Sequence, residues 1–428
     1  MRVLVLSLNA WNLSNSTGNT LSNLFCKLND SDKVANIYCR NERVDNSICK
    51  RYFRITESDI IHSLFTLRRC GREMSYKDCG NERELQMSQR TNYENFFSLL
   101  KNYRCAIVLL FREFLWSLPV WKNKKLKKFV TEFSPEVIYM HGHYNLYMHW
   151  ILSYCQKISG AKVAMYWADD MYGRKSYSPI NFFYESLLRK RFRKSILLSS
   201  LLFGGSLPLC KEYSHIFGKQ FIPFIKECKR VKFDDNKYIG NPIIIVYAGN
   251  LLFGRENVIV ELAKAIGRIN RKGLLHQYFL KIFSNTTPST ESLLFLDDKR
   301  NCCYMGCKPY QEVCEEMDRS DLSLFIESFD KNNILSTRLS FSTKIIDCMQ
   351  SSAGILAIGP SNIASIDYIE NNKLGYTITD VTTIEHKLIY LAENPGIIKV
   401  MNRHKFEFAK RNHTNTSSKA IAEIRGLL

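Results

Sequence analysis

Hydrophobic and polar positions follow one rhythm along most of this chain. Short apolar runs, of the kind that form buried parallel strands, alternate with segments whose apolar residues recur at helical spacing. The first run, VLVLSL at residues 3–8, precedes a polar loop with Gly18 and then a helix from about Leu21. Alternating strands and helices predict an α/β protein with parallel sheets. The later runs are VANIYC (34–39), PEVIYMHGH (135–143), AKVAMYW (161–167), SLLFGG (200–205), PIIIVYA (242–248), FLKIFS (279–284), DLSLFI (321–326) and GILAIG (354–359).

The pattern divides the chain into two domains, as its 428 residues also suggest. We expect a first Rossmann-like domain at residues 1–225, with an irregular basic insertion near 45–125. Residues 226–240 are charged and lack a period, so they are interpreted as a linker. A second Rossmann-like domain follows at 241–400, and 401–428 is expected to form closing helices, the last returning to the first domain.

Composition indicates an ordinary globular protein with an unusual charge. The net charge of +19 favours anionic partners: phosphates, nucleic acid or an anionic lipid surface. No apolar run is long enough for a membrane span. The 14 cysteines are scattered without paired zinc-site spacing, which predicts no metal site and fits a reducing cytoplasm.

A tryptophan- and lysine-rich segment at Trp116–Lys128 admits two interpretations. Basic residues beside tryptophans suit an interfacial segment on the anionic inner face of a membrane. The alternative is a helix that packs its aromatic residues inward and leaves its lysines in solvent.

The stretch Ser340–Pro360 organises the second domain in this interpretation. Its pattern predicts a loop, a helix capped by Ser342, a turn and a buried strand. The first-turn amides at Thr343 and Lys344 would then face an anion. Lys344 and Asp347, three residues apart, would share one face and suit a diphosphate and a ribose hydroxyl. An ordinary solvated helix start is the alternative.

Two pairs of polar side chains follow buried strands in the first domain. His141 and His143 end one strand, and Asp169 and Asp170 follow the next. Parallel strands bring their carboxyl ends to one edge, where ligands bind. The alternatives are structural histidines, and a helix N-cap for one aspartate.

At this point the ordered motifs carry a resemblance. YAGNLLFGRENVIVELAKAI, GCKPYQEVCEEMDRSDLSLF and FSTKIIDCMQSSAGILAIGP together resemble the donor-binding domain of GT-B glycosyltransferases, in particular the retaining family numbered four. MYWADD, SLLFGGS and KEYSHIFGKQFIPF resemble members that build bacterial surface polysaccharides. The resemblance implies two Rossmann-like domains facing a cleft, with parallel sheets.

The resemblance places the donor's diphosphate against the second domain. Gly249 and Asn250 would lie in the turn after the first strand of that domain, and Arg255 stands where relatives carry a phosphate-binding lysine. A guanidinium can grip two phosphate oxygens, whereas the alternative is a surface arginine. Asn250 replaces a second basic residue of many relatives.

Of two acidic positions in the family pattern, this sequence retains one and replaces the other. Many relatives carry two glutamates eight positions apart; here the second matches Asp347 and the first matches Leu339. Glu327 could supply the missing contact to the transferred sugar, with a carboxylate at the site's rim as the alternative.

In the first domain, the resemblance gives Gly18 the role of letting the backbone approach the donor phosphates. His141 or His143 matches the region of an active-site histidine, which can donate to a sugar hydroxyl. Asp169 and Asp170 are candidates for binding the acceptor hydroxyl or acting as its base.

The expected activity is therefore sugar transfer from a nucleotide-sugar, such as a UDP- or GDP-sugar, to an acceptor hydroxyl. The acceptor is expected to be a lipid-linked glycan of capsule or O-antigen synthesis, at the cytoplasmic face of the inner membrane, with retention and without metal or cofactor. A GT-B-like sugar-nucleotide epimerase and a nucleic-acid-binding protein are the alternatives. Nucleic acid is not expected as a partner, because the basic residues are spread without aromatic RNA-reading motifs.

Overall fold

The computed structural model describes residues 1–13, 16–66, 70–75, 106–173 and 179–428, which form two compact units. Unit 1 comprises Met1–Phe224 and Ser417–Leu428, and unit 2 comprises Ile225–Thr416. Unit 2 is therefore inserted in the chain between two parts of unit 1. The expected linker at 226–240 is counted within unit 2, and so is most of the expected closing segment.

Unit 1 is built on an eight-stranded sheet. The strands are β1 (Arg2–Ser7), β2 (Lys33–Tyr38), β3 (Arg51–Arg54), β4 (Arg72–Ser75), β5 (Val137–His141), β6 (Lys162–Trp167), β7 (Leu201–Gly204) and β8 (Ile222–Pro223). Their spatial order is β4-β3-β2-β1-β5-β6-β7-β8. All neighbours are parallel except β4, which runs antiparallel to β3 at the edge.

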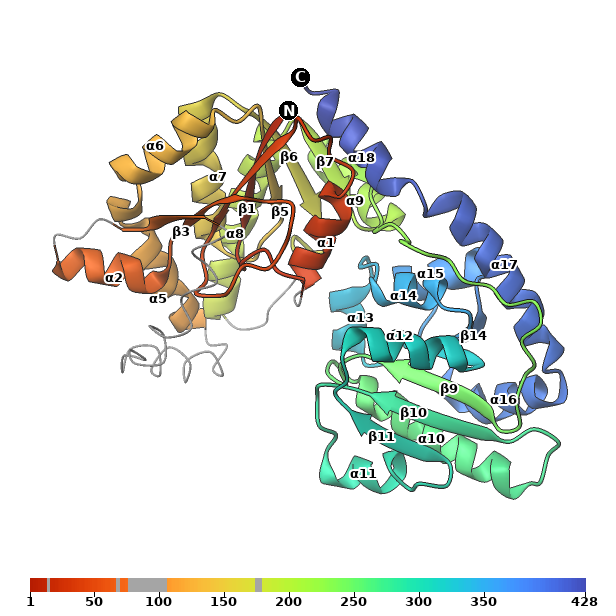
Figure 1. Ribbon diagram of the computed structural model, residues 1–428. Helices are drawn as coiled ribbons and strands as arrows, with labels where there is room; N and C mark the ends of the chain where they lie inside the picture. Colours follow the sequence, from red (N-terminus) through yellow and green to blue (C-terminus); the bar gives the residue numbers. More distant parts are fainter. Residues whose placement is uncertain (14–15, 67–69, 76–105, 174–178) are drawn as a thin grey trace. The chain divides into compact units, whose positions relative to one another are not determined.

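Helices cover both faces of this sheet (Figure 1). They are α1 (Ser16–Phe25), α2 (Glu57–Phe65), α5 (Ala106–Ser117), η2 (Pro119–Trp121), α6 (Lys124–Phe133), α7 (Leu146–Ser159), α8 (Pro179–Leu198), α9 (Leu207–Phe217) and α18 (Thr416–Arg425). Alternating strand residues, such as Val3, Val5 and Tyr139, share one core with α1 and α18. The opposite face carries Trp167, whose ring packs against Phe192 of α8 and Tyr213 of α9.

Unit 2 is built on a six-stranded sheet in which every neighbouring pair is parallel. Its strands are β9 (Ile243–Ala248), β10 (Tyr278–Phe283), β11 (Cys302–Gly306), β12 (Leu322–Ile326), β13 (Gly354–Ile358) and β14 (Tyr376–Ile378). The spatial order is β11-β10-β9-β12-β13-β14. The central strands are apolar and buried on both faces, as parallel sheets require.

Two separate cores flank the sheet of unit 2. The helices are α10 (Arg255–Arg271), α11 (Thr290–Leu296), α12 (Tyr310–Arg319), α13 (Lys331–Thr337), α14 (Lys344–Gln350), α15 (Ala364–Asn371), η3 (Val381–Thr383), α16 (Ile384–Glu393) and α17 (Gly396–Asn412). One core unites α10 with α16, and the other unites α14, α15 and α17. Figure 1 shows α10 and α12 on opposite sides of this sheet.

The predicted fold class is confirmed: both units are α/β and rest on largely parallel sheets. We expected the segment 45–125 to be an irregular insertion of helices and loops, and its described parts also contain two short strands that the pattern does not predict. It contributes β3 and β4, which extend the first sheet, and the helices α2 and α5. These strands have only four residues each, too few for a clear alternating pattern.

The membrane interpretation of Trp116–Lys128 is also wrong for the tryptophans. Trp116 and Trp121 are fully buried. Trp116 stacks on Tyr147 of α7 with ring centroids 4.2 Å apart, and Trp121 Nε1 donates to the Trp116 carbonyl at 2.8 Å. Lys124 and Lys127 on α6 are exposed. The alternative, inward aromatic residues with solvated lysines, is the observed one. Among the described residues, no helix is long and apolar enough to cross a membrane.

Candidate functional site

Several predicted donor residues of unit 2 meet at the carboxyl edge of its sheet. β9 and β12 are neighbouring parallel strands, so the residues that follow them emerge side by side. Gly249 and Asn250 follow β9, and Glu327 follows β12. The helices α10 and α14 begin at Arg255 and Lys344. Topology therefore brings together residues that lie up to about a hundred positions apart.

Arg255 is held in place by groups from both strand ends. Its Nη2 forms an ion pair with Glu327 Oε2 at 2.9 Å, and its Nε donates to the Ile326 carbonyl at 3.2 Å. Its Nη1 donates to Asn250 Oδ1 at 3.1 Å. The side chains of Arg255 and Glu327 are only 11% and 5% exposed. Neither alternative from the sequence applies, since Arg255 is not a surface arginine and Glu327 is not at the rim.

Lys344 contributes a second cation, and none of the described residues places a counter-ion within hydrogen-bonding distance of it. Its Nζ is buried, and no described group accepts a hydrogen bond from it. The Nζ lies 5.5 Å from the centroid of the Tyr247 ring. Burial, followed by the neighbouring Arg255 charge, lowers the pKa of Lys344 to about 8, partly opposed by Glu327. A buried ammonium without a partner is costly, and an incoming anion would offset that cost.

Gly249 is needed where it is because Lys344 passes over it. A Cβ atom at position 249 would lie 2.1 Å from Lys344 Nζ and 2.6 Å from Lys344 Cε. The neighbouring Tyr247 hydroxyl donates to the Asn250 carbonyl at 2.6 Å, which fixes the turn after β9. The turn and the lysine are therefore packed as one unit.

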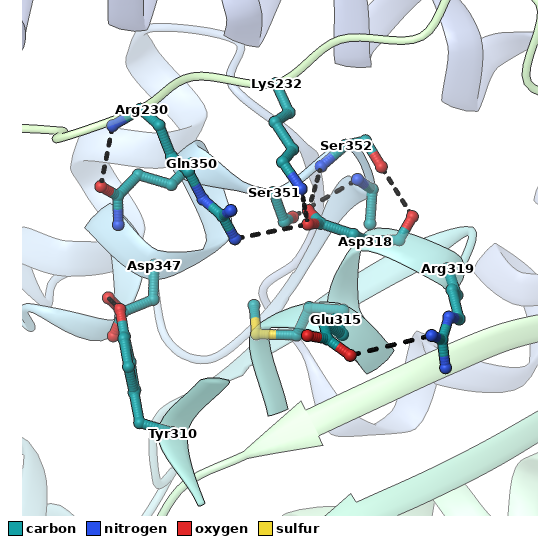
Figure 2. Close-up of polar contacts among 12 residues, drawn as sticks. Arg230, Lys232, Tyr310, Glu315, Asp318, Arg319, Asp347, Gln350, Ser351 and Ser352 are labelled. Atoms are coloured by element: carbon teal, nitrogen blue, oxygen red, sulfur yellow. Dashed lines mark hydrogen bonds and ion pairs between the residues drawn. The ribbon is translucent and has the colours of Figure 1, made fainter. Parts of the chain in front are cut away.

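Asp347 is held by a tyrosine and a lysine from outside α14. Tyr310 of α12 donates its hydroxyl to Asp347 Oδ1 at 3.0 Å, and Lys226 Nζ lies 3.8 Å from the same oxygen. Burial raises the pKa of Asp347, opposed chiefly by Lys226. Figure 2 shows the Tyr310 ring directed at Asp347, and Gln350 further along α14 facing the segment that carries Arg230. Lys344 and Asp347 are both half-buried, whereas Ile345, Ile346 and Met349 of the same helix are buried. The two polar side chains therefore lie on the less buried side of α14, although each has different neighbours.

The start of α14 differs from the predicted capped helix. The N-cap is Thr343, in helical conformation and without a side-chain cap, so the prediction of Ser342 as N-cap was wrong. Ile345 N and Ile346 N donate to the carbonyls of Ser342 and Thr343 in a tight turn. The Ser342 amide donates to Ser365 Oγ at 2.9 Å. The first turn of α14 is therefore closed by backbone hydrogen bonds, without a side-chain cap.

In unit 1, the two predicted histidines lie at and just after the end of β5, where His141 is half-buried and His143 is buried. Burial lowers the pKa of His141 to about 4 and that of His143 well below its usual value. Their Nε2 atoms have no hydrogen-bond partner among the described residues. The His143 carbonyl lies 3.0 Å from Nε2 of the buried His149. Both imidazoles are therefore neutral at pH 7, so they can donate or accept hydrogen bonds but carry no charge.

The two aspartates after β6 have different surroundings. Asp170 is buried, and its Oδ1 accepts from Gly173 N at 2.8 Å and Tyr213 Oη at 3.1 Å. The Asp170 side chain therefore closes a turn by accepting a hydrogen bond from a backbone amide three residues later. The alternative predicted for one aspartate, a helix N-cap, uses the same kind of contact. Asp169 is partly exposed at the same edge.

Gly18 lies within the first turns of α1, not in the loop where the sequence pattern placed it. A Cβ atom there would lie 1.9 Å from the Asn12 carbonyl oxygen. Close approach of the chain after β1 therefore requires glycine at this position, whatever ligand the unit binds.

Three residues of the site were not singled out from the sequence. Tyr247 reads as an ordinary core residue of its strand, Tyr310 as part of a basic turn, and Lys226 as part of a linker. The alternation of polar and apolar residues did not indicate a role for any of the three. Each one acts through a contact with a residue far away in the sequence. Among the described residues, no group of three His, Cys, Asp or Glu side chains could hold a metal ion.

No protein-family model matches this sequence, and no curated protein matches it either. Solved structures do match. Sucrose-phosphate synthase from Thermosynechococcus elongatus has a TM-score of 0.62 at 11% identity, covering 100% of this chain and 98% of that chain. Anabaena HepE, solved in complex with UDP-glucose, has a TM-score of 0.59 at 12% identity, with 100% of both chains covered.

A third match is an α,α-trehalose-phosphate synthase from Burkholderia xenovorans, solved with glucose-6-phosphate. Its TM-score is 0.58 at 8% identity, with 100% of both chains covered. At such low identities the likeness concerns the fold alone. These structures are GT-B glycosyltransferases, and the chain has their fold of two α/β units.

Proposed function

We propose that this protein is a glycosyltransferase that moves a sugar from a nucleotide-sugar to an acceptor hydroxyl. The observation that carries the proposal is the buried, unpartnered ammonium of Lys344 beside Arg255, at the sheet edge of unit 2. Two cations with one carboxylate between them leave a local positive charge. A diphosphate supplies the missing negative charge.

The chemistry follows from where charge develops. The bond between the anomeric carbon and the diphosphate oxygen breaks, and a bond from that carbon to the acceptor oxygen forms. Negative charge grows on the departing diphosphate, so a fixed cation aimed at it stabilises the transition state. Lys344 is proposed for this role, with Arg255 as the second positive group and with Gly249, Asn250, Ser342 and Thr343 lining the phosphates.

Asp347 is proposed to bind the ribose diol, and the hydrogen bond from Tyr310 is proposed to fix the orientation of its carboxylate. Glu327 is proposed to act through Arg255, because its carboxylate is already committed to that guanidinium. In unit 1, Gly18 is proposed to let the backbone approach the phosphates. Asp169 is proposed to take the acceptor proton, since Asp170 is engaged in its turn. His141 or His143, as a neutral imidazole, is proposed to contact a sugar hydroxyl.

The finer assignments come from the resemblance and the charge. A UDP-sugar is the preferred donor in this proposal, because the similar Anabaena structure was solved with UDP-glucose. We propose retention at the anomeric carbon and no resident cofactor. The net charge of +19 supports an acceptor held on an anionic lipid carrier, as in capsule or O-antigen synthesis at the inner face of a membrane.

The experiment is a panel of labelled UDP- and GDP-sugars, each incubated with the protein, with and without a bacterial membrane extract. Donor consumption that requires the extract, with label recovered in lipid, supports the proposal. Interconversion of the sugar without acceptor would instead identify an epimerase and sink it. Lys344→Ala should lose the activity, whereas Lys272→Ala, which removes an exposed lysine directly after α10, should retain it.

A further inference from the structure

Unit 1 contains a groove that the donor site does not use. It lies between α5, α7 and α8, has a volume of about 340 Å³, and is walled by Leu110, Phe114, Leu146, Trp150 and Leu187. Its lining also includes three cations of α8, Lys190, Arg191 and Lys194. An apolar trough edged by positive charge is complementary to a molecule with an apolar tail and an anionic head.

The cations of this groove are available for an external partner. None of the three forms an ion pair with a described carboxylate, and Lys190 and Lys194 are exposed. Arg191 is half-buried, with its guanidinium carbon 5.9 Å from the centroid of the Trp150 ring. The carboxylate in the lining, Glu113, is already satisfied by Arg112, Tyr184 and the Tyr147 amide. The groove therefore presents net positive charge.

The two helices α5 and α8, which line the groove, also carry large apolar side chains that face solvent. Phe111 and Phe114 of α5 are 52% and 60% exposed, and Phe182 and Phe183 of α8 are 59% and 56% exposed. Phe183, Leu187, Lys190 and Lys194 recur at helical spacing, so they form one stripe along α8. Helices α5 and α8 are in contact. Phenylalanines beside unpaired lysines are the composition of an interfacial membrane-binding surface.

We propose that the face formed by α5 and α8 docks on an anionic phospholipid bilayer, with an acyl chain entering the groove and lipid phosphates at Lys190, Arg191 and Lys194. A single-stranded nucleic acid could use the same cations and stack its bases on the exposed phenylalanines. The trough favours lipid, because its leucine-rich walls suit an acyl chain and offer a polar base few partners. The inference goes beyond the proposed function, because docking on lipid needs neither donor nor acceptor. Failure of one leaves the other standing.

Trp150 makes the proposal directly measurable. All five tryptophans lie in the described part of the chain, and four of them, Trp11, Trp116, Trp121 and Trp167, are at most 1% exposed. Trp150, in the groove wall, is partly exposed. Quenchers carried on lipid acyl chains should therefore reduce the fluorescence of Trp150 and leave the fluorescence of the four buried tryptophans unchanged.

The test mixes the full chain with vesicles of phosphatidylcholine alone or with added phosphatidylglycerol, using acyl chains brominated near the headgroup. We expect sedimentation with the anionic vesicles only, together with tryptophan quenching that Trp150→Phe abolishes. Lys190→Ser with Lys194→Ser should weaken binding roughly tenfold or more. The matched control, Lys124→Ser with Lys127→Ser on α6, removes the same charge and should bind nearly as wild type.

Four results would overturn the proposal: no binding to anionic vesicles, binding without quenching, equal losses from the α8 and α6 variants, or competition by RNA at equal charge concentration. Phe114→Ser separates apolar insertion from simple charge attraction, because its effect should persist at high salt, where charge is screened. Unchanged thermal unfolding of the variants, all at surface positions, excludes misfolding as the cause.

Discussion

Arg255 and Glu327 form a buried ion pair, 2.9 Å from Nη2 to Oε2, that joins the start of α10 to the end of β12. The two residues are 72 positions apart in the chain. Arg255 also donates a hydrogen bond to the Asn250 side chain, so the pair is linked to the turn after β9. It also sets the field felt by Lys344, since Arg255 lowers the pKa of that lysine and Glu327 raises it. Structure and charge at this edge are thus coupled through one contact.

Breaking that pair from one side should destabilise unit 2. Arg255→Met removes one member of a buried ion pair and keeps the Glu327 carboxylate, which costs about 3–5 kcal/mol of unfolding free energy. The double variant Arg255→Met with Glu327→Met should be less destabilised than the sum of the single variants. Urea unfolding followed by circular dichroism measures this. Strictly additive losses would show that the two side chains are not energetically coupled.

Lys344→Met should stabilise the donor-free protein while weakening donor binding. The substitution removes a buried charge that lacks a hydrogen-bond partner, so the unfolding free energy should rise by about 1–3 kcal/mol at neutral pH. Loss of a charge-assisted contact should raise the Kd for UDP roughly tenfold or more. Thermal unfolding and calorimetry give the two readouts. Lys272→Ala serves as the control; a Lys344→Met variant with normal UDP affinity would remove Lys344 from the site.

Affinity for UDP should fall as the pH rises through about 8. The pKa of Lys344 in the free protein is about 8, so the cation that binds phosphate is lost above this value. Bound anion favours the charged form, and binding therefore takes up a proton near pH 8. Calorimetry at pH 7 and pH 9 in two buffers measures affinity and proton uptake. Lys344→Met should flatten the profile, and a wild-type profile that is already flat would contradict the assignment.

Lys405 should make stability increase with pH. This lysine of α17 is fully buried and donates to the carbonyls of Cys348, Ser351 and Ala353 near the end of α14. Burial lowers its pKa from 10.5 to about 7. Above pH 7 the unfolded chain binds more protons, so this group adds stability as the pH rises toward 10.5. Between pH 7 and 8.5 wild type should gain about 1–2 kcal/mol relative to Lys405→Met. Parallel curves for the two proteins would refute this.

Gly249→Ala should impair donor binding more than folding. The new Cβ would meet the end of the Lys344 side chain, which is flexible and can move. We expect a small change in melting temperature but a clear loss of UDP affinity. Gly18→Ala provides the contrast, because its Cβ would meet the Asn12 backbone, which cannot yield as easily. That variant should lose stability; equal behaviour of the two variants would contradict this distinction.

The strand and helix rhythm of the sequence was sufficient to predict two α/β units. It identified β9, β12 and β13 because their apolar runs are long and uninterrupted. It missed β3, whose four residues RYFR place arginines at both ends. It also left the tryptophans of 116–128 undecided, since only the stacking of Trp116 on Tyr147 shows which way they face.

Within the site, residue types were predicted better than their contacts. Arg255, Glu327 and Lys344 were each chosen from motif positions, and they do lie together. Their pairing could not be predicted, because it depends on β12 lying beside β9 although β10 and β11 come between them in the chain. The prediction of Ser342 as N-cap was wrong because the helix begins one residue later, at a turn closed by backbone hydrogen bonds that residue types do not show.

The two-part composition of unit 1 has a consequence for synthesis on the ribosome. Its core includes Ala420, Ile421 and Ile424 of α18, and Arg425 pairs with Asp32. A nascent chain that has emerged only as far as Thr416 therefore carries every residue of unit 2, while one apolar face of the first sheet still lacks the part of its cover that α18 supplies. Cotranslational folding should thus finish in the reverse of translation order, with the later unit maturing first and the earlier one needing protection until α18 arrives.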